Sequence, residues 1–236
     1  MIKVTDESEF KRLLEGLSND IVDAHIHYKL YKDLCEASEE FPFVIPQSNT
    51  FWSLTLKSHL NTSLHALTRA YDKTDGALHL FSFLQTIKAN PDLFSTAKFR
   101  ERKKADPFID SLAEECRTPD LVNLESDISL CSHKEPLVNI LVIHRNNVLA
   151  HKSAVNTALG RSIYETHPLT FEDFETLLKR AIIILNTYSQ LFEASSYSTQ
   201  IIAHNDFRYI FECINSAIEK SRLTTIEFAK QFRDDE

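Results

Sequence analysis

The segment from Ile143 to Lys152 combines side chains that can carry out proton transfer with side chains that belong in a core. It holds an arginine at position 145, two amides, and histidines at positions 144 and 151. Histidine titrates near neutral pH and can accept or donate a proton, whereas arginine keeps its charge and presents a planar fork of donors to phosphate oxygens. These residue types suit transesterification of RNA, in which the 2′-hydroxyl is the nucleophile. Arg145, Asn146 and His151 are therefore the candidate catalytic residues.

Helical spacing indicates how these side chains are presented. Seven residues of an α-helix turn through about 700°, so His144 and His151 are expected on one stripe with apolar neighbours. Arg145 is turned about 100° from His144, but its long stem can bring the guanidinium back beside the stripe. Asn147 lies four residues before His151 and can hydrogen-bond the ring. The candidate substrate-binding residues here are His144, Asn147 and Lys152, with a hydrogen-bonded core histidine as the alternative for His144.

The pattern of Arg145-Asn146 followed by His151 resembles the signature of the HEPN superfamily, in which five residues between arginine and histidine are within the usual spacing. The run Arg-Asn-Asn-Val-Leu-Ala-His is most similar to the AbiU-type branch, found among bacterial abortive-infection proteins. In that branch an earlier helix carries an Arg-x-x-Asp segment, and residues 69–72 are similar. Arg69 and Asp72 are further candidates for substrate binding, with a simple surface ion pair between them as the alternative.

The resemblance implies a metal-independent endoribonuclease of toxin or phage-defence type. Such enzymes leave a cyclic phosphate and build their site where two motifs meet across a homodimer. RNA, a second copy of the chain, and an antitoxin or defence partner are the expected partners, and no cofactor or metal is expected. One alternative is a non-catalytic HEPN module that binds RNA, a nucleotide or a protein. Another, a toxin whose tyrosine two residues past the histidine is modified, is disfavoured because Ser153 occupies that position.

The composition favours a helical protein with a single domain over residues 1–236. With 43% hydrophobic residues the chain can bury a real core, and only three glycines leave few positions for the turns of a β protein. Four widely spaced cysteines without a Cys-x-x-Cys pair are typical of reduced core residues. No apolar run reaches the ~18 residues of a membrane span, and the chain starts with an acidic amphipathic segment. We therefore expect a cytoplasmic protein with no membrane contact.

Apolar periodicity predicts the elements that position the motif. Long helices are expected at about 6–37, 48–72, 136–151 and 170–191, a last helix at about 205–221, and shorter ones at 77–89, 108–116 and 119–130. Asp6 and Thr170 are expected to open helices with capping boxes, and Thr118 to cap a helix that begins with proline. The predicted fold is all-α, an antiparallel bundle of four to five long helices with additional short helices.

Charge is unevenly distributed along the chain. A net charge of −8 argues against a general nucleic-acid binder, because overall repulsion slows encounter with a polyanion. Between His133 and Arg161, however, basic residues outnumber the single acid Glu135, which permits a local positive patch. A second basic run at 98–104 contains Phe99 and suits a phosphate backbone and a base, although a solvated charged face is the favoured interpretation.

Overall fold

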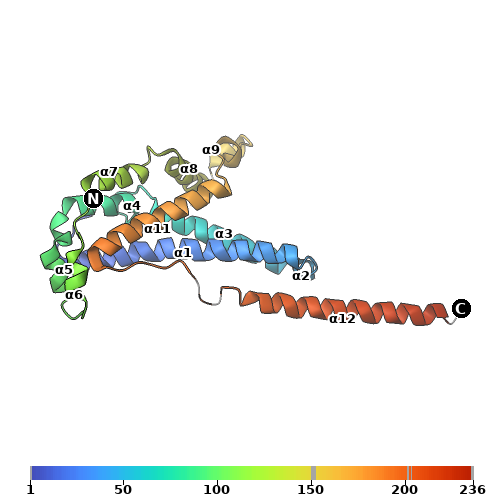
Figure 1. Ribbon diagram of the computed structural model, residues 1–236. Coiled ribbons are helices and arrows are strands. Elements are labelled where there is room, and N and C mark those ends of the chain that lie inside the picture. The colour runs from blue at the N-terminus through green and yellow to red at the C-terminus, as the bar shows by residue number, and fades with distance from the viewer. Residues whose placement is uncertain (1, 150–152, 201, 203, 235–236) are drawn as a thin grey trace. The chain divides into compact units, whose positions relative to one another are not determined.

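The computed structural model describes residues 2–149, 153–200, 202 and 204–234, the last four of them without their side chains. Within these ranges the chain forms helices and no strand, which confirms the predicted all-α class (Figure 1). None of the helices in the described part of the chain is long and apolar enough to cross a membrane.

The chain divides into two compact units. Unit 1 comprises Met1–His25 and Ser63–Thr199, and unit 2 comprises Ile26–Thr62 and Gln200–Glu236. Two long helices, α1 (Glu7–Glu40) and α3 (Asn49–Ala70), contribute residues to both units. The single domain over residues 1–236 stays a prediction.

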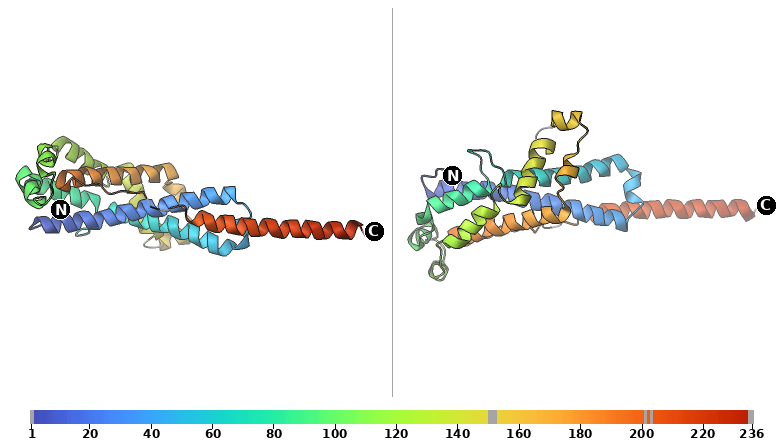
Figure 2. Two further views of the ribbon diagram at one scale, coloured as in Figure 1. Left: turned by 60° about the horizontal axis from the view of Figure 1, so that its bottom comes forward. Right: turned by 90° about the horizontal axis from the view of Figure 1, so that it is seen from above.

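Helix α11 (Phe171–Glu193) is the central strut of unit 1. It runs antiparallel to the first part of α1, because Phe192 contacts Phe10 near one end and the carbonyl of Leu178 lies 3.0 Å from His25 Nε2 near the other (Figures 1 and 2). Its start follows from the sequence: the Thr170 hydroxyl accepts from the Asp173 amide, and the Asp173 carboxylate accepts from the Thr170 amide. The predicted capping box is confirmed.

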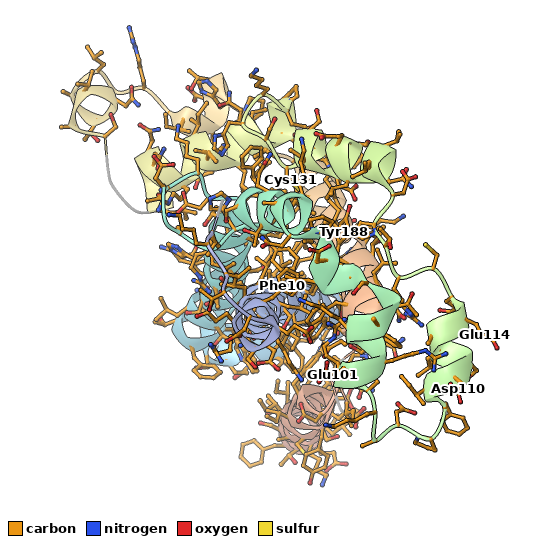
Figure 3. The ribbon with its side chains drawn as sticks, turned by 90° about the vertical axis from the view of Figure 1, so that its left-hand side faces the viewer. Phe10, Glu101, Asp110, Glu114, Cys131 and Tyr188 are labelled. Atoms are coloured by element: carbon orange, nitrogen blue, oxygen red, sulfur yellow. The ribbon has the colours of Figure 1, made fainter. Side chains whose placement is uncertain are left out.

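The core of unit 1 is built on a cluster of aromatic rings. Phe10 of α1 packs at ring-centroid distances of 5.2 Å from Phe83, 5.5 Å from Phe94 and 4.7 Å from Phe192. Phe83 belongs to α4 (Leu80–Ala89), and Phe94 ends the short 3₁₀ helix η1 (Pro91–Phe94). Figure 3 shows Phe10 in the filled centre of the unit. Segments far apart in sequence are therefore joined by rings that are almost fully buried.

Three shorter helices follow: α5 (Thr96–Arg102), α6 (Ile109–Glu114) and α7 (Leu121–Leu130). The cap predicted for α7 was wrong, because Asp120 rather than Thr118 caps the helix, accepting from the amide of Asn123 at 2.8 Å. In the basic run, Phe99 is fully buried and Arg102 donates to the carbonyls of Leu93 and Phe192. The run is therefore partly structural and offers no exposed ring to a base.

The motif lies in a series of short elements between α7 and α11. They are α8 (Pro136–His144), the π-helical turn η2 (Arg145–Leu149), α9 (Ala154–Ala158) and α10 (Ile163–Thr166). Arg180 of α11 ties the start of α8 to the strut, donating to the Leu130 carbonyl at 3.0 Å and pairing with Glu135 at 3.3 Å. Glu135 also caps α8 through the Val138 amide.

Unit 2 has its own small core. Trp52 of α3 packs against Phe211 of α12 (Phe207–Asp234) at 4.8 Å, and Leu34, Ala37 and Val44 complete the buried cluster. Val44 opens the short helix α2 (Val44–Gln47). Helix α12 extends beyond residue 221, where the last helix was expected to end.

Replacing Phe10 with alanine should destabilise unit 1 strongly, because three aromatic neighbours would face the vacated space. We expect a loss of about 3–5 kcal/mol in the free energy of unfolding, measured by urea titration. Phe108→Ala is the matched control: its side chain is 69% exposed, so the same truncation should cost within ~0.5 kcal/mol. Equal losses in the two variants would contradict the assigned core.

Candidate functional site

The motif begins where α8 changes its hydrogen-bond pattern. The α-helical pattern ends at His144, and Arg145–Leu149 continue as a π-helix. The prediction of an uninterrupted α-helix from 136 to 151 was therefore wrong. A π turn adds a residue to the hydrogen-bonded ring, so the side chains of Arg145–Leu149 do not follow the 100° spacing of an α-helix. Such turns are rare and frequently occur at functional sites.

An ion pair with Asp72 fixes Arg145. Arg145 Nη2 donates to Asp72 Oδ2 at 3.0 Å, and Nη1 donates to Asn146 Oδ1 at 3.2 Å. The Asp72 side chain is 10% exposed, whereas that of Arg145 is 32% exposed. The guanidinium is thus anchored on one side and still reaches solvent. Asn146 helps to hold it by accepting one of its hydrogen bonds.

Asp72 is held in its ionised form by several donors. Its Oδ1 accepts from the amides of Lys73 at 2.6 Å and Thr74 at 3.3 Å, which closes the turn after α3. Burial alone would raise the pKa of Asp72, but these two amides, the Arg145 guanidinium and the Thr74 hydroxyl together lower it. A charged carboxylate therefore stands behind Arg145 at neutral pH.

Arg69 and Asp72 do not pair with each other, so the simple surface pair considered for them was wrong. Arg69 is exposed and donates through Nε to Asp20 Oδ1 of α1 at 2.9 Å. Asp72 lies past Ala70, the last residue of α3, and the chain there has left the helical path. Its carboxylate is consequently turned toward the motif instead of lying one helical turn from Arg69.

His144 is a buried residue with a defined hydrogen bond. Its side chain is 1% exposed, and Nε2 lies 2.6 Å from the carbonyl oxygen of His167. Because a carbonyl oxygen can only accept, Nε2 carries the proton. The ring also meets Tyr164 edge-on at 5.1 Å. This environment favours the core-histidine alternative over substrate binding for His144.

Asn147 borders a cavity next to the motif. Its Nδ2 donates to the Ile143 carbonyl at 2.9 Å, which leaves Oδ1 as an acceptor. The cavity has a volume of about 400 Å³ and is lined by Asn147, Val148, Ser153, Asn156, Thr157, Arg161, Ser162, Ile163 and Tyr164.

His151 and Lys152 lie outside the described residues, so their roles in catalysis and substrate binding stay predictions.

Two histidines near the anchor were missed in the sequence. His133 and His79 both lie close enough to Asp72 for its negative charge to favour the charged form of each ring. Burial lowers the pKa of both histidines, and this effect outweighs the negative charge of Asp72, which would raise it. They come from different segments, and only the fold brings them together beside the turn that holds Asp72.

A known family of sequences matches the part of the chain that contains these residues. The sequence model of the AbiU2 family of HEPN domains matches residues 7–210. The chain belongs to this family. The matched range of this AbiU2 chain includes both the Arg145 segment and the Arg-x-x-Asp segment that ends in Asp72. Searches of curated proteins and of solved structures returned no significant match.

Asp72→Asn should destabilise this AbiU2 chain in a pH-dependent way. The folded-state pKa of Asp72 is lowered, so the wild-type carboxylate stabilises the fold above the unfolded-state value of ~3.9, and this contribution is lost as pH falls through the folded-state value. We expect a loss of about 1–3 kcal/mol at pH 7, shrinking below about pH 4, by urea unfolding across pH.

Asp20→Asn provides the comparison, because it removes the acid of the exposed Arg69 pair. A surface pair is worth about 0–1 kcal/mol, so this variant should lose less at pH 7. A stability difference for Asp72→Asn that stays constant from neutral to acid pH would contradict the assigned ionisation.

Proposed function

We propose that this AbiU2 protein is a metal-independent endoribonuclease of toxin or phage-defence type. The observation that carries the proposal is the Arg145 guanidinium, which is anchored by Asp72 and still partly exposed beside a polar cavity. Such a cation is suited to stabilise negative charge that builds on a phosphate in the transition state. Membership in a HEPN family supports the same reading.

The proposed reaction needs no nucleophile from the protein. The ribose 2′-oxygen bonds to the adjacent phosphorus, and the bond from phosphorus to the 5′-oxygen of the next nucleotide breaks. His151 accepts the 2′-hydroxyl proton, a second acid gives a proton to the leaving 5′-oxygen, and Arg145 stabilises the charged phosphorane. The products are a 2′,3′-cyclic phosphate and a free 5′-hydroxyl. Asn146 keeps the guanidinium in place.

The second acid is proposed to be the same histidine of a second copy of the chain. One chain supplies one histidine in the motif pattern, whereas the reaction needs a base and an acid. His144 is a poor intrachain candidate because it is buried and bonded to a backbone carbonyl. A two-fold dimer that brings two motifs together would supply both groups.

A specific observation favours a second candidate, the non-catalytic HEPN module. The Arg145–Asp72 pair is itself a structural contact that joins the motif to the turn after α3. In this alternative the pair maintains the fold, and the exposed part of Arg145 binds RNA or a nucleotide without cleaving it.

Cleavage of RNA distinguishes the two candidates. We expect His151→Ala and Arg145→Ala to lose at least about a hundredfold in rate, the typical contribution of a proton-transfer or charge-stabilising group. His65→Ala is the matched control, since His65 is exposed on α3. Cleavage should persist in excess chelator and stop on a substrate with deoxyribose at the scissile position. Wild-type protein without activity on any RNA would leave only the non-catalytic module.

The dimer is tested separately by sedimentation velocity at micromolar concentration. We expect a species of twice the chain mass, and we expect His151→Ala to keep it, because the proposed role of His151 is chemical. A strictly monomeric wild type that nevertheless cleaves RNA would refute the shared site and require a second acid from within one chain.

A further inference from the structure

The cavity beside η2 contains a set of polar groups that the proposed reaction does not use. We propose that it binds one nucleotide of a single-stranded RNA substrate, with a phosphate on Arg161, the base edge on Asn156 and the base face on Tyr164. This inference rests on the proposed function, because it says where the RNA strand continues when one of its phosphates is bound at Arg145. None of these three residues was singled out as a site residue from the sequence.

The shape and position of the cavity fit a nucleotide. Its volume of about 400 Å³ falls within the range of about 300–1,000 Å³ typical of small-molecule sites. Asn147 and Val148 of η2 form one wall, so the cavity adjoins the turn that begins with Arg145. A single strand that places one phosphate at Arg145 can therefore continue into it.

Among the described residues that line the cavity, Arg161 is the cation. Within the described part of the chain it forms no ion pair, whereas Arg69, Arg145 and Arg180 each have a carboxylate partner. It is exposed, and the described residues that line the cavity with it include no acid. An arginine fork without a competing carboxylate is well suited to bind phosphate oxygens.

Asn156 and Tyr164 supply the groups that a base needs. The Asn156 backbone amide caps α9 by donating to Ser153 Oγ at 3.3 Å, but its side chain has no hydrogen-bond partner among the described residues. A free amide offers one acceptor and two donors, which match the edges of bases. The Tyr164 side chain stays 59% exposed although its ring meets His144 edge-on, so a ring face remains for stacking.

The lining also indicates why the ligand is a nucleotide. A metal ion would need carboxylate, imidazole or thiolate ligands, and none of the described residues that line the cavity offers one. An acidic peptide would match Arg161 but would leave the amides and the tyrosine face without a planar partner. A nucleotide uses all three types of group at once, and single-stranded RNA exposes its bases for this purpose.

Binding can be measured apart from cleavage with a short fluorescent single-stranded RNA whose 2′-hydroxyls are methylated, since this probe cannot form the cyclic phosphate. We expect Arg161→Ala to weaken binding about tenfold by fluorescence anisotropy, the usual loss of one charge-assisted contact, and Arg161→Lys to weaken it less. Arg12→Ala is the matched control, because Arg12 is an exposed arginine on α1 outside the cavity. Asn156→Ala should change the relative affinities for adenine, cytosine and uracil homopolymers.

The outcomes separate this inference from the ribonuclease proposal. Wild-type protein that binds the probe through Arg161 but cleaves no RNA supports the nucleotide site and refutes the enzyme. Wild-type protein that cleaves RNA, with Arg161→Ala binding no more weakly than Arg12→Ala, overturns the nucleotide site and leaves the enzyme in place. Absence of any probe binding by wild type also overturns the site. Melting temperatures of the variants should stay close to wild type, because the side chains of Arg161 and Asn156 form no hydrogen bond or ion pair with other described residues and neither is fully buried.

Discussion

The position of the motif depends on the ion pair between Arg145 and Asp72. One carboxylate oxygen binds the guanidinium and the other accepts the amides that close the turn after α3. Truncating either partner would leave a largely buried charge or a set of unpaired amides, which is more costly than losing a surface pair. The π turn and the turn after α3 are consequently held by one side chain, and neither can shift without disturbing the other.

A second anchor holds the motif from the opposite direction. His144, one residue before Arg145, donates to the His167 carbonyl and contacts Tyr164, so the segment that returns toward α11 is tied to the end of α8. Arg180 of α11 meanwhile fixes Glu135 at the beginning of α8. The short helix that carries the motif is thus secured at both ends. Buried hydrogen bonds of this kind favour one arrangement over many similar ones.

The sequence was sufficient for features that depend on local chemistry. The capping box at Thr170 and the long apolar stripe after it predicted α11, because cap and stripe involve residues within a few positions of each other. Asp6 likewise accepts from the Glu9 amide at 2.8 Å at the start of α1. The π turn was not foreseeable, since its residues have ordinary helical spacing. The partners of Arg69 and Asp72 depend on where α3 ends. The helix was expected to end at residue 72 but ends at Ala70, and this difference of two residues turns Asp72 away from Arg69.

The same dependence on tertiary placement explains why the cavity was missed. Arg161 was visible in the sequence only as one basic residue of a positive stretch, and nothing local marked it as lacking an acidic partner. Asn156 looked like any helix residue. Only the return of the chain through α9 and α10 sets both residues opposite Asn147. The role proposed for Arg161 therefore rests on its having no acidic partner among the described residues, which is a property of the folded chain.

An arginine that is anchored by an acid is well prepared to act on a phosphate. The fork has five donors, and the contacts with Asp72 and Asn146 engage only part of them. The Asp72 carboxylate reduces the net positive charge at Arg145, yet it removes rotamer freedom from this long side chain when the protein folds. That entropy would then not be lost during the proposed reaction, in which correct orientation lowers the barrier. On a chain of net charge −8, a cation fixed in place and exposed at one edge is more effective than a free one.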